Sequence, residues 1–236
     1  MDPENEPQLP GAAYQVVIVD DHPLFRAALK SAVCAACSAT SFLEADSVAT
    51  LLDTLDRHPG VDLLLLDLNL PGAHGFSALA YLRGAHPELP VVVVSALDDL
   101  TTVQQAMAFG AQGFLSKSAN AESIGASVRA VLRGDVVTPA GYRGGSGDPP
   151  DHAALEVAER LAQLTPQQFR VFGKLCSGRL NKQIAYELQI TEATVKAHMT
   201  AIMRKLGAAN RTQTALLAAR LTLNPDEIKA QPEEPE

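Results

Sequence analysis

The stretch Leu63-Leu-Leu-Leu-Asp67 decides the fold of the first half of the chain. Its leucines occupy every position rather than every second one, which indicates a strand buried on both faces, as in a parallel sheet covered by helices. Comparable strands are predicted at Val16–Val19 and Val91–Val94, and shorter ones near Ser41–Glu44 and at Gly113–Leu115. Five buried strands separated by longer segments predict one parallel sheet.

Helical periodicity fills the gaps between these strands. The predicted helices cover residues 23–36, 48–57, 76–83, 101–109 and 121–133. Strands that alternate with helices are typical of an α/β domain whose five-stranded parallel sheet is doubly wound, with helices on both faces. We expect this domain to end near residue 135.

The composition excludes several classes of protein. The chain has 236 residues, enough for two modest domains. Its apolar runs are too short to cross a bilayer. The N-terminal residues lack the basic region followed by an apolar stretch that is typical of a cleaved signal peptide, so we do not expect one. The three cysteines, Cys34, Cys37 and Cys176, are too few for a disulfide framework and are predicted to be small core residues. We therefore expect a cytoplasmic protein with no membrane partner.

The net charge of −8 conceals opposite charges in the two halves. Residues 14–140 carry 7 Lys/Arg and 13 Asp/Glu, a net charge of −6, whereas residues 165–222 carry 9 Lys/Arg and 2 Asp/Glu, a net charge of +7. A basic segment inside an acidic protein favours an anionic partner for the C-terminal part. A solvated basic face without a partner gives the same counts.

The second half of the chain has a different pattern from the first. A Gly/Pro/Ser cluster at residues 141–150 indicates a linker, and a short helix is predicted at Ala153–Leu164. Beyond it the pattern is helical throughout, until the acidic, Pro-containing end of the chain. We therefore predict a disordered tail (1–13), an α/β domain (14–135), a linker with a short helix (136–160), an all-α domain (161–222) and an acidic tail (223–236).

Polar side chains stand where the predicted buried strands stop. Asp20 and Asp21 follow the first strand, Asp67 ends the third, Ser95 follows the fourth, and the fifth leads to Lys117. Ligand sites of open parallel sheets form beyond the carboxyl ends of the strands, so these groups should converge. Three neighbouring carboxylates repel each other unless a cation joins them, and Mg²⁺ suits such oxygen ligands. A lysine and a hydroxyl are donors that a transferred phosphoryl group needs, and an Asp carboxylate can accept it covalently.

These residues resemble the receiver domain of response regulators, which has a flavodoxin-like fold. The motifs are Asp20-Asp21-His22-Pro23, Asp67-Leu-Asn-Leu-Pro-Gly72, Ser95-Ala96 and Phe114-Leu-Ser-Lys117, and the resemblance covers about residues 14–135. It implies that Asp67 is the phosphoacceptor and that Phe114 is a switch residue whose rotation is coupled to Ser95. The remaining implied roles are Mg²⁺ binding by Asp20, Asp21, Asp67 and the backbone carbonyl of Asn69, and phosphoryl binding by Lys117 and Ser95.

Other interpretations of the same residues are weaker. Asp67 could cap a helix and Lys117 could be a surface ion-pair partner, but a set of buried acids needs a reason. A nucleotide site is disfavoured because no glycine-rich phosphate-binding turn follows a strand. Phosphatases with an Asp nucleophile typically carry a second Asp two positions later, where this chain has Asn69. His22 and His74 flank the predicted phosphorylation site, and we expect both to be solvated.

Strong helix-start signals mark the all-α domain. Thr165-Pro-Gln-Gln168 supplies an N-cap, a proline at the first position and a capping-box glutamine. Asn181 is the expected cap of the next helix, and Thr191 that of a third helix with apolar residues every three or four positions. Two short helices joined by a tight turn, the second with a polar and basic outer face, are typical of a helix-turn-helix.

The same region resembles the four-helix LuxR-type helix-turn-helix, and with the receiver it resembles a NarL/FixJ-family response regulator. The motifs are Leu164-Thr-Pro166, Asn181-Lys-Gln-Ile-Ala185, Thr191-Glu-Ala-Thr-Val-Lys-Ala-His198, Lys205-Leu-Gly207 and Asn210-Arg-Thr-Gln213. The resemblance implies that Glu192–Leu206 is the recognition helix and that Thr212–Leu221 dimerises. The implied contacts are base-edge or nearby backbone contacts by Lys196, Ala197 and Thr200, and phosphate contacts by Lys182, Thr194, Arg204 and Arg211. The family commonly has Arg-Glu where this chain has Gln167-Gln168, so we expect an internal ion pair to be missing.

We therefore predict a two-component response regulator rather than an enzyme. A histidine kinase would phosphorylate Asp67 with Mg²⁺ bound, and the phosphorylated protein would form homodimers on paired half-sites of double-stranded DNA. Two alternatives stay open: a DNA-binding regulator that works without phosphorylation, through protein–protein contacts, and a phosphatase or phosphotransferase with an accessory DNA-binding domain.

Overall fold

Five parallel strands form the sheet in the computed structural model, which describes residues 14–139, 142 and 152–222. Their order is β2-β1-β3-β4-β5, and every residue of β3 and β4 is buried because helices cover both faces. This confirms the predicted doubly wound fold. The strands are β1 (Tyr14–Val19), β2 (Thr40–Ala45), β3 (Leu63–Asp67), β4 (Val91–Ser95) and β5 (Gly113–Ser116).

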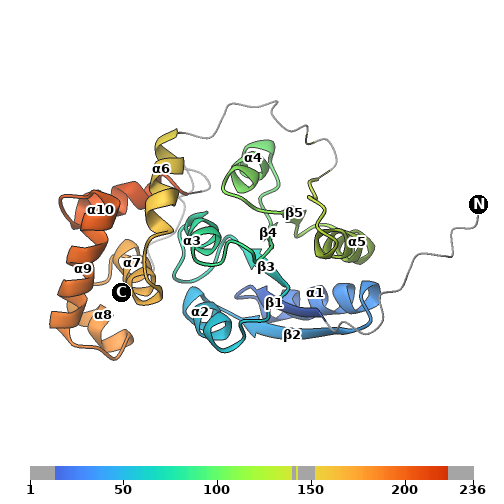
Figure 1. Cartoon of the computed structure of the whole chain (residues 1–236), viewed down its shortest axis with the longest axis horizontal. Helices are drawn as coiled ribbons and strands as arrows, with labels where there is room; N and C mark the ends of the chain where they lie inside the picture. Colours follow the sequence, from blue (N-terminus) through green and yellow to red (C-terminus); the bar gives the residue numbers. More distant parts are fainter. Residues whose placement is uncertain (1–13, 140–141, 143–151, 223–236) are drawn as a thin grey trace, which may run out of the picture.

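Five helices cover this sheet in two layers (Figure 1). The first and fifth helices pack on one face, and the second, third and fourth on the other. The bounds lie within two residues of the prediction. In α1, α2, α4 and α5 the buried positions recur every three or four residues, whereas residues 77–82 of α3 are all buried. The helices are α1 (Pro23–Ala36), α2 (Val48–Arg57), α3 (Ser77–Ala85), α4 (Leu100–Ala108) and α5 (Ala121–Leu132).

Residues 152–222 form a helical unit. Thr165 caps its second helix as predicted, since its hydroxyl accepts from the Gln168 amide at 3.3 Å. The predicted cap at Asn181 is wrong: Asn181 is the first helical residue, and the Leu180 amide donates to Gln183 Oε1 at 2.8 Å. The helices are α6 (His152–Leu161), α7 (Pro166–Cys176), α8 (Asn181–Glu187), α9 (Glu192–Leu206) and α10 (Arg211–Ala219).

Several predicted segments lie outside the described residues. They are the N-terminal tail (1–13), the acidic tail (223–236) and nearly all of the Gly/Pro/Ser cluster at 141–150. The short helix predicted at Ala153–Leu164 is present as α6, but it ends at Leu161, where a turn joins it to α7.

A hydrogen bond replaces the ion pair expected to be missing from the helical unit. Lys205 Nζ donates to Gln168 Oε1 at 2.7 Å and to the Gln163 carbonyl at 2.7 Å. Gln168→Glu should therefore raise the free energy of unfolding by about 1 kcal/mol, since charge-assisted hydrogen bonds are stronger than neutral ones. Urea unfolding measures the gain, and the double variant Gln168→Glu with Lys205→Met should lose it.

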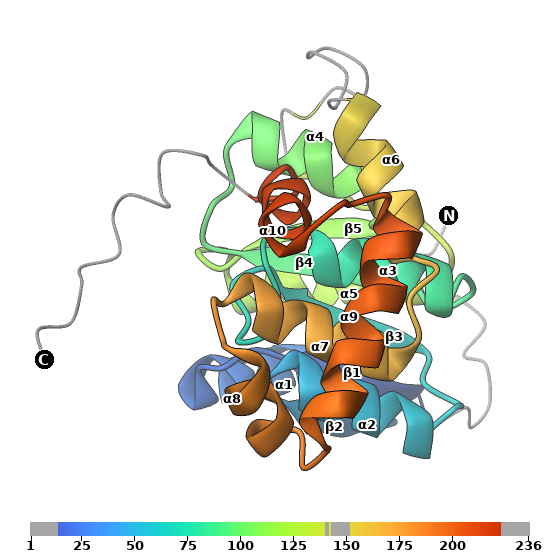
Figure 2. The ribbon, with the colours of Figure 1, turned by 90° about the vertical axis from the view of Figure 1, so that its left-hand side faces the viewer.

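The helical unit packs directly on the α/β domain, with α6 against α3 and α7 against α2 (Figures 1 and 2). The Tyr81 and Phe169 rings stack with their centroids 4.2 Å apart, and both side chains are buried. Arg170 pairs with Asp53, and the Phe76 amide donates to the Leu221 carbonyl at 2.8 Å. Aromatic stacking and a backbone hydrogen bond thus join the two units.

His74 belongs to this interface, so the prediction of a solvated side chain is wrong for it. Its ring is half-buried, and Nε2 has no hydrogen-bond partner. Burial lowers the pKa of His74, although a hydrogen bond with the Gly173 backbone opposes the shift. The folded state therefore favours the neutral ring.

The lowered pKa of His74 predicts a pH dependence. Its contribution to the free energy of unfolding is full above the ordinary histidine value of about 6.5. It should decline as the pH falls through that value towards the lower folded pKa, because only the unfolded chain takes up the proton there. Urea unfolding between pH 7.5 and 5.5 should show this loss, and His74→Gln should flatten it. An unchanged profile in the variant would contradict the assignment.

Candidate phosphoryl-transfer site and nucleic-acid interface

Two buried carboxylates share one lysine at the carboxyl ends of the central strands. Lys117 Nζ lies 2.7 Å from Asp20 Oδ2 and 2.8 Å from Asp67 Oδ2. The Asp20 and Asp67 side chains are 1% and 3% exposed, so each depends on a nearby cation for its charge. The strand order explains why the two carboxylates lie close together. β1 and β3 are neighbours in the sheet, and the chain continues from β1 to β2 on one side and from β3 to β4 on the other.

The pKa directions agree with this geometry. Burial raises the pKa of Asp67, and the Asp20 charge adds to the rise, while Lys117 and the Asn69 amide act against it. Burial also works against the charged form of Lys117, but its hydrogen bonds to Asp20 and Asp67 outweigh that effect and raise its pKa. A buried acid that is hard to ionise and a firmly protonated lysine suit a site built for a dianionic group.

Asp21 and His22 complete the acidic cluster. His22 Nδ1 lies 2.6 Å from Asp21 Oδ1 and 3.1 Å from Asp20 Oδ1. Four ligand atoms lie within 4.8 Å of one another, one each from Asp20, Asp21, His22 and Asp67. Three carboxylates at this separation fit a hard divalent cation such as Mg²⁺.

A cavity of about 730 Å³ opens beside Asp67. Ser95 is buried at the end of β4 and lines this cavity, and its hydroxyl accepts from the Leu97 amide at 3.1 Å. A phosphoryl group on Asp67 would thus be near both Lys117 and Ser95. The lining residues are His22, Leu24, Phe25, Ala28, Asp67, Asn69, Ser95, Ala96, Leu97 and Lys117.

Sequence reasoning missed Phe25 and placed Phe114 on resemblance alone. Lys117 Nζ lies 4.9 Å from the centre of the Phe25 ring, a cation–π contact that no local pattern announces. Phe114 is 1% exposed on β5, so its ring points into the core, and it is not among the residues that line the cavity. The Asn69 amide donates to Asp67 Oδ1 at 3.3 Å.

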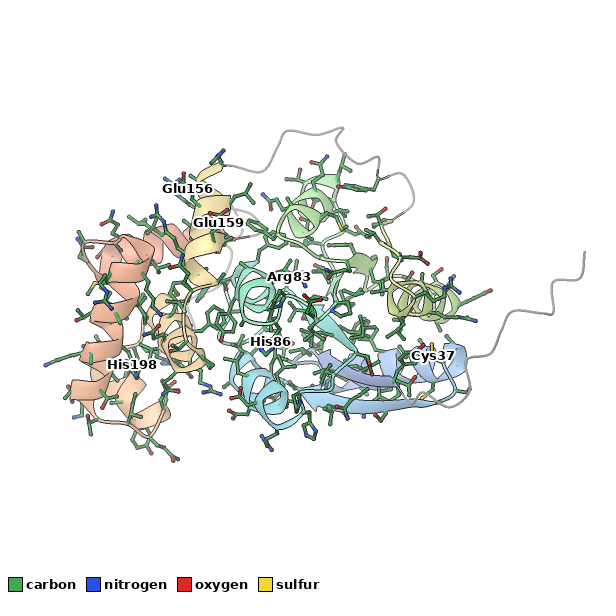
Figure 3. The ribbon with its side chains drawn as sticks, viewed as in Figure 1. Cys37, Arg83, His86, Glu156, Glu159 and His198 are labelled. Carbon is green, nitrogen blue, oxygen red and sulfur yellow. The ribbon has the colours of Figure 1, made fainter. Side chains whose placement is uncertain are left out.

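The outer face of α9 is open to solvent. Lys196, Ala197 and Thr200 are exposed, whereas Val195 and Met199 of the same helix are buried. The helix lies on the side of the unit away from the sheet, as the position of His198 shows (Figure 3). The three residues predicted to face base edges are therefore accessible to a duplex.

The residues predicted to contact phosphates differ in their surroundings. Lys182 and Arg204 are exposed, and the half-buried Thr194 shares a hydrogen bond with the Thr191 hydroxyl at 2.9 Å. Arg211 donates from one guanidinium nitrogen to the carbonyls of Leu175 at 3.1 Å and Arg179 at 2.5 Å. Arg211 thus ties α10 to the end of α7, and only its other nitrogens are available to a phosphate.

The cysteines only partly fulfil the prediction of core residues. Cys34 is exposed on the outer side of α1, and Cys37 is half-buried at the end of that helix remote from the helical unit (Figure 3). Cys176 packs against the core, and burial raises the pKa of its thiol to about 12. None of the described helices is long and apolar enough to cross a membrane.

Comparison with known proteins identifies both halves. Residues 16–129 match the response regulator receiver domain, and residues 162–218 match the bacterial regulatory proteins of the luxR family. A receiver joined to this DNA-binding module defines a transcriptional response regulator. The chain belongs to the NarL/FixJ family of two-component response regulators, which regulate transcription.

Individual relatives support this membership. The glycerol metabolism activator of Pseudomonas putida is 39% identical over 210 residues, which cover 87% of this chain and 95% of the relative. The nitrate/nitrite response regulator NarP of Escherichia coli is 30% identical over 204 residues, which cover 86% of this chain and 94% of NarP. The RcsB response regulator of Salmonella typhimurium shares the fold, with a TM-score of 0.50 at 19% identity over 86% of this chain and 96% of RcsB.

Proposed function

We propose that this response regulator is switched by phosphorylation of Asp67 and then binds DNA through α9. The observation that carries the proposal is the meeting of Asp20, Asp67 and Lys117 at the carboxyl edge of the sheet, beside an open cavity. Burying two acids against one lysine is costly for a site with a purely structural role. A transferred phosphoryl group gives that arrangement a purpose.

The residues have distinct roles in this proposal. Asp67 is the phosphoacceptor, and Asp20, Asp21, Asp67 and the backbone carbonyl of Asn69 would hold Mg²⁺. When bound, the cation would neutralise negative charge on the phosphoryl oxygens. Lys117 and Ser95 bind those oxygens, and Phe114 responds as the switch residue.

The chemical step is an in-line phosphoryl transfer from a histidine kinase. An Asp67 carboxylate oxygen attacks the phosphorus of the kinase phosphohistidine, so that a P–O bond forms and the P–N bond breaks. The departing histidine nitrogen keeps the electron pair and takes a proton from solvent. Lys117 orients the phosphoryl group through charge-assisted hydrogen bonds.

The DNA-facing part of the proposal rests on exposure and charge. Lys196, Ala197 and Thr200 reach base edges or the nearby backbone, and the phosphorylated protein binds paired half-sites as a homodimer joined through α10. An RcsB structure contains two dimers bound to two parallel DNAs, which is consistent with such an assembly for this fold. The candidates for phosphate contacts are Lys182, Thr194, Arg204 and Arg211.

The remaining features follow from this role. The α/β domain (14–135) is the receiver, residues 136–160 connect it to the DNA-binding domain (161–222), and the protein works in the cytoplasm, where the chromosome is. It acts as a regulator and not as an enzyme with a turnover substrate.

Intact-mass measurement tests the receiver chemistry. After incubation with Mg²⁺ and acetyl phosphate, the wild type should gain one phosphoryl group and Asp67→Asn none. No adduct in a folded wild type, sampled within seconds of mixing, would favour control by protein–protein contacts alone. Steady hydrolysis of small phosphoesters that disappears in Asp67→Asn would favour a phosphatase.

Binding to a random-sequence DNA duplex tests the phosphate contacts. Arg204→Ala should weaken binding by a similar factor on every duplex and reduce the slope of log affinity against log salt by about 1. Fluorescence anisotropy measures the slope at salt concentrations between about 50 and 200 mM, the range over which the affinity of such proteins for DNA falls steeply. Arg133→Ala, on the receiver, is the control and should leave the slope unchanged.

A further inference from the structure

We propose that the Phe25 ring positions Lys117 for phosphoryl transfer through a cation–π contact. Phe25 is then a positioning residue, because it acts on the reaction only through the Lys117 ammonium. The proposal rests on the proposed phosphorylation of Asp67 and adds a residue that lies outside the motifs at the strand ends. It gives a role to the phenyl ring in the wall of the cavity beside Asp67.

Two carboxylates and one ring surround the Lys117 ammonium. Its Nζ lies 2.7 Å from Asp20 Oδ2, 2.8 Å from Asp67 Oδ2 and 4.9 Å from the centre of the Phe25 ring. At that distance the negative face of an aromatic ring attracts a cation. The Lys117 side chain is only 18% exposed, so water and salt screen the attraction weakly. The ring therefore contributes to where the ammonium rests.

The start of α1 holds the Phe25 ring in this place. Phe25 lies in the first turn of α1, and its half-buried side chain packs against the core on that face of the sheet. The next residue, Arg26, donates to the Asp20 carbonyl at 2.6 Å and to the Glu44 carboxylate at 2.7 Å. Arg26 thus ties the start of α1 to the carboxyl ends of β1 and β2. The ring is fixed relative to Asp20, and so to the site.

An uncharged ring suits this position better than a third acidic side chain would. Another carboxylate would also attract Lys117, but it would repel the incoming phosphoryl group and compete with it for the N–H donors. The ring of Phe25 carries no net charge and is a far weaker acceptor than a phosphoryl oxygen. It can therefore hold the ammonium and leave its hydrogen bonds free to change partner.

The change of partner is the reason why the ring affects the rate. An attraction of equal strength before and during the transfer would leave the rate unchanged. Asp67 loses negative charge as its oxygen bonds to phosphorus, whereas Asp20 keeps its charge and still draws the ammonium. The ring limits the movement of Lys117 towards Asp20, so Lys117 spends more of its time where it can donate to the phosphoryl oxygens.

Fluorinated phenylalanines at position 25 provide the test. Fluorine withdraws negative charge from the ring face and weakens its attraction for a cation, while the shape of the side chain changes little. Intact mass gives the initial rate of phosphorylation by acetyl phosphate with Mg²⁺. The same series at Phe42 is the matched control, because Phe42 is also half-buried and packs against the same core but does not line the cavity.

The rate should fall with each added fluorine at position 25, by about fivefold for the pentafluoro side chain, the size of an ordinary cation–π contact. Phe25→Leu should lose about as much, and Phe25→Tyr, which keeps the ring, should recover most of the rate. In a Lys117→Met background Phe25→Leu should cause no further loss, because there is no ammonium to position. The series at position 42 should match the wild type.

NMR reports the contact itself without a phosphate donor. The ε-methylene protons of Lys117 should show a ring-current shift that Phe25→Leu removes and Phe25→Tyr keeps, and the rest of the spectrum shows that each variant is folded. A shift that Phe25→Leu leaves unchanged would overturn the contact.

The kinetic outcomes separate the other possibilities. If Phe25→Leu slows the reaction but fluorination does not, the ring is merely an apolar wall of the cavity and the proposal fails. Full additivity of Phe25→Leu and Lys117→Met would likewise show that Phe25 does not act through Lys117. If the wild type shows the ring-current shift but forms no adduct, the proposed function fails, and the positioning role with it, while the contact stands.

Discussion

Replacing Lys117 with methionine is expected to lower the free energy of unfolding by about 3 kcal/mol at pH 7 without divalent ions, because removing one member of a buried ion pair leaves charge uncompensated. Lys117 joins Asp20 and Asp67, and both carboxylates are almost fully buried. Phosphorylation by acetyl phosphate should also slow by about a hundredfold, since a positioned cation at a developing charge contributes this much.

Mg²⁺ separates the structural from the chemical part of this effect. The cation should recover part of the lost stability, because it supplies positive charge to the cluster of Asp20, Asp21 and Asp67. It should not recover the rate, since the donor from Lys117 is still missing. Lys30→Met is the control: Lys30 pairs with Glu44 at the surface, and such pairs contribute less than about 1 kcal/mol. Equal losses in both variants would contradict the assignment.

The raised pKa of Asp67 sets the pH dependence of this deficit. The folded protein holds a proton on Asp67 at pH values where the unfolded chain has released it. The contribution of this proton to the free energy of unfolding is full below the ordinary aspartate pKa and is lost as the pH rises through the raised pKa of Asp67. Lys117→Met should therefore be most destabilising at neutral pH and approach the wild type towards about pH 4. A deficit that does not change with pH would exclude this cause.

Phe169→Ala is expected to lower the free energy of unfolding by about 3 to 4 kcal/mol, the usual cost of removing a fully buried aromatic ring. Its effect should also cross between the units, because the Phe169 ring stacks on Tyr81 of α3 at 4.2 Å as well as on Phe172 of α7 at 5.9 Å. We expect one cooperative thermal transition in the wild type and two in the variant, since the stacked pair joins the two units.

Phe172→Ala is the matched comparison, because it removes the same atoms from a side chain that is equally buried in α7. It should destabilise the helical unit by a similar amount and leave the transition of the α/β domain closer to that of the wild type. Differential scanning calorimetry distinguishes the two cases. Identical calorimetric profiles for both variants would show that the Tyr81–Phe169 stack does not couple the units.

Local sequence patterns were sufficient to predict a strand or a helix start wherever the residues that form the pattern lie within that one element. The runs at Val16–Val19, Leu63–Leu66 and Val91–Val94 predicted buried parallel strands because only a strand covered on both faces tolerates apolar residues at every position. Thr165 and Thr191 marked helix starts because their hydroxyls accept from amides three residues further on. Leu180 shows the limit of such signals, since a cap position can be filled without a capping side chain.

The sequence by itself determined the order of strands and helices along the chain. It also determined which polar residues follow the strands, and such residues share the carboxyl edge in any parallel sheet. The tertiary structure decided which atoms meet: Lys117 between Asp20 and Asp67 and over the Phe25 ring, and Arg211 on the carbonyls of Leu175 and Arg179. It also decided that His74 is half-buried between the two units. The physical reason is range: periodicity and capping act over a few residues, whereas these contacts join residues far apart in the chain, and closing such loops leaves no local pattern.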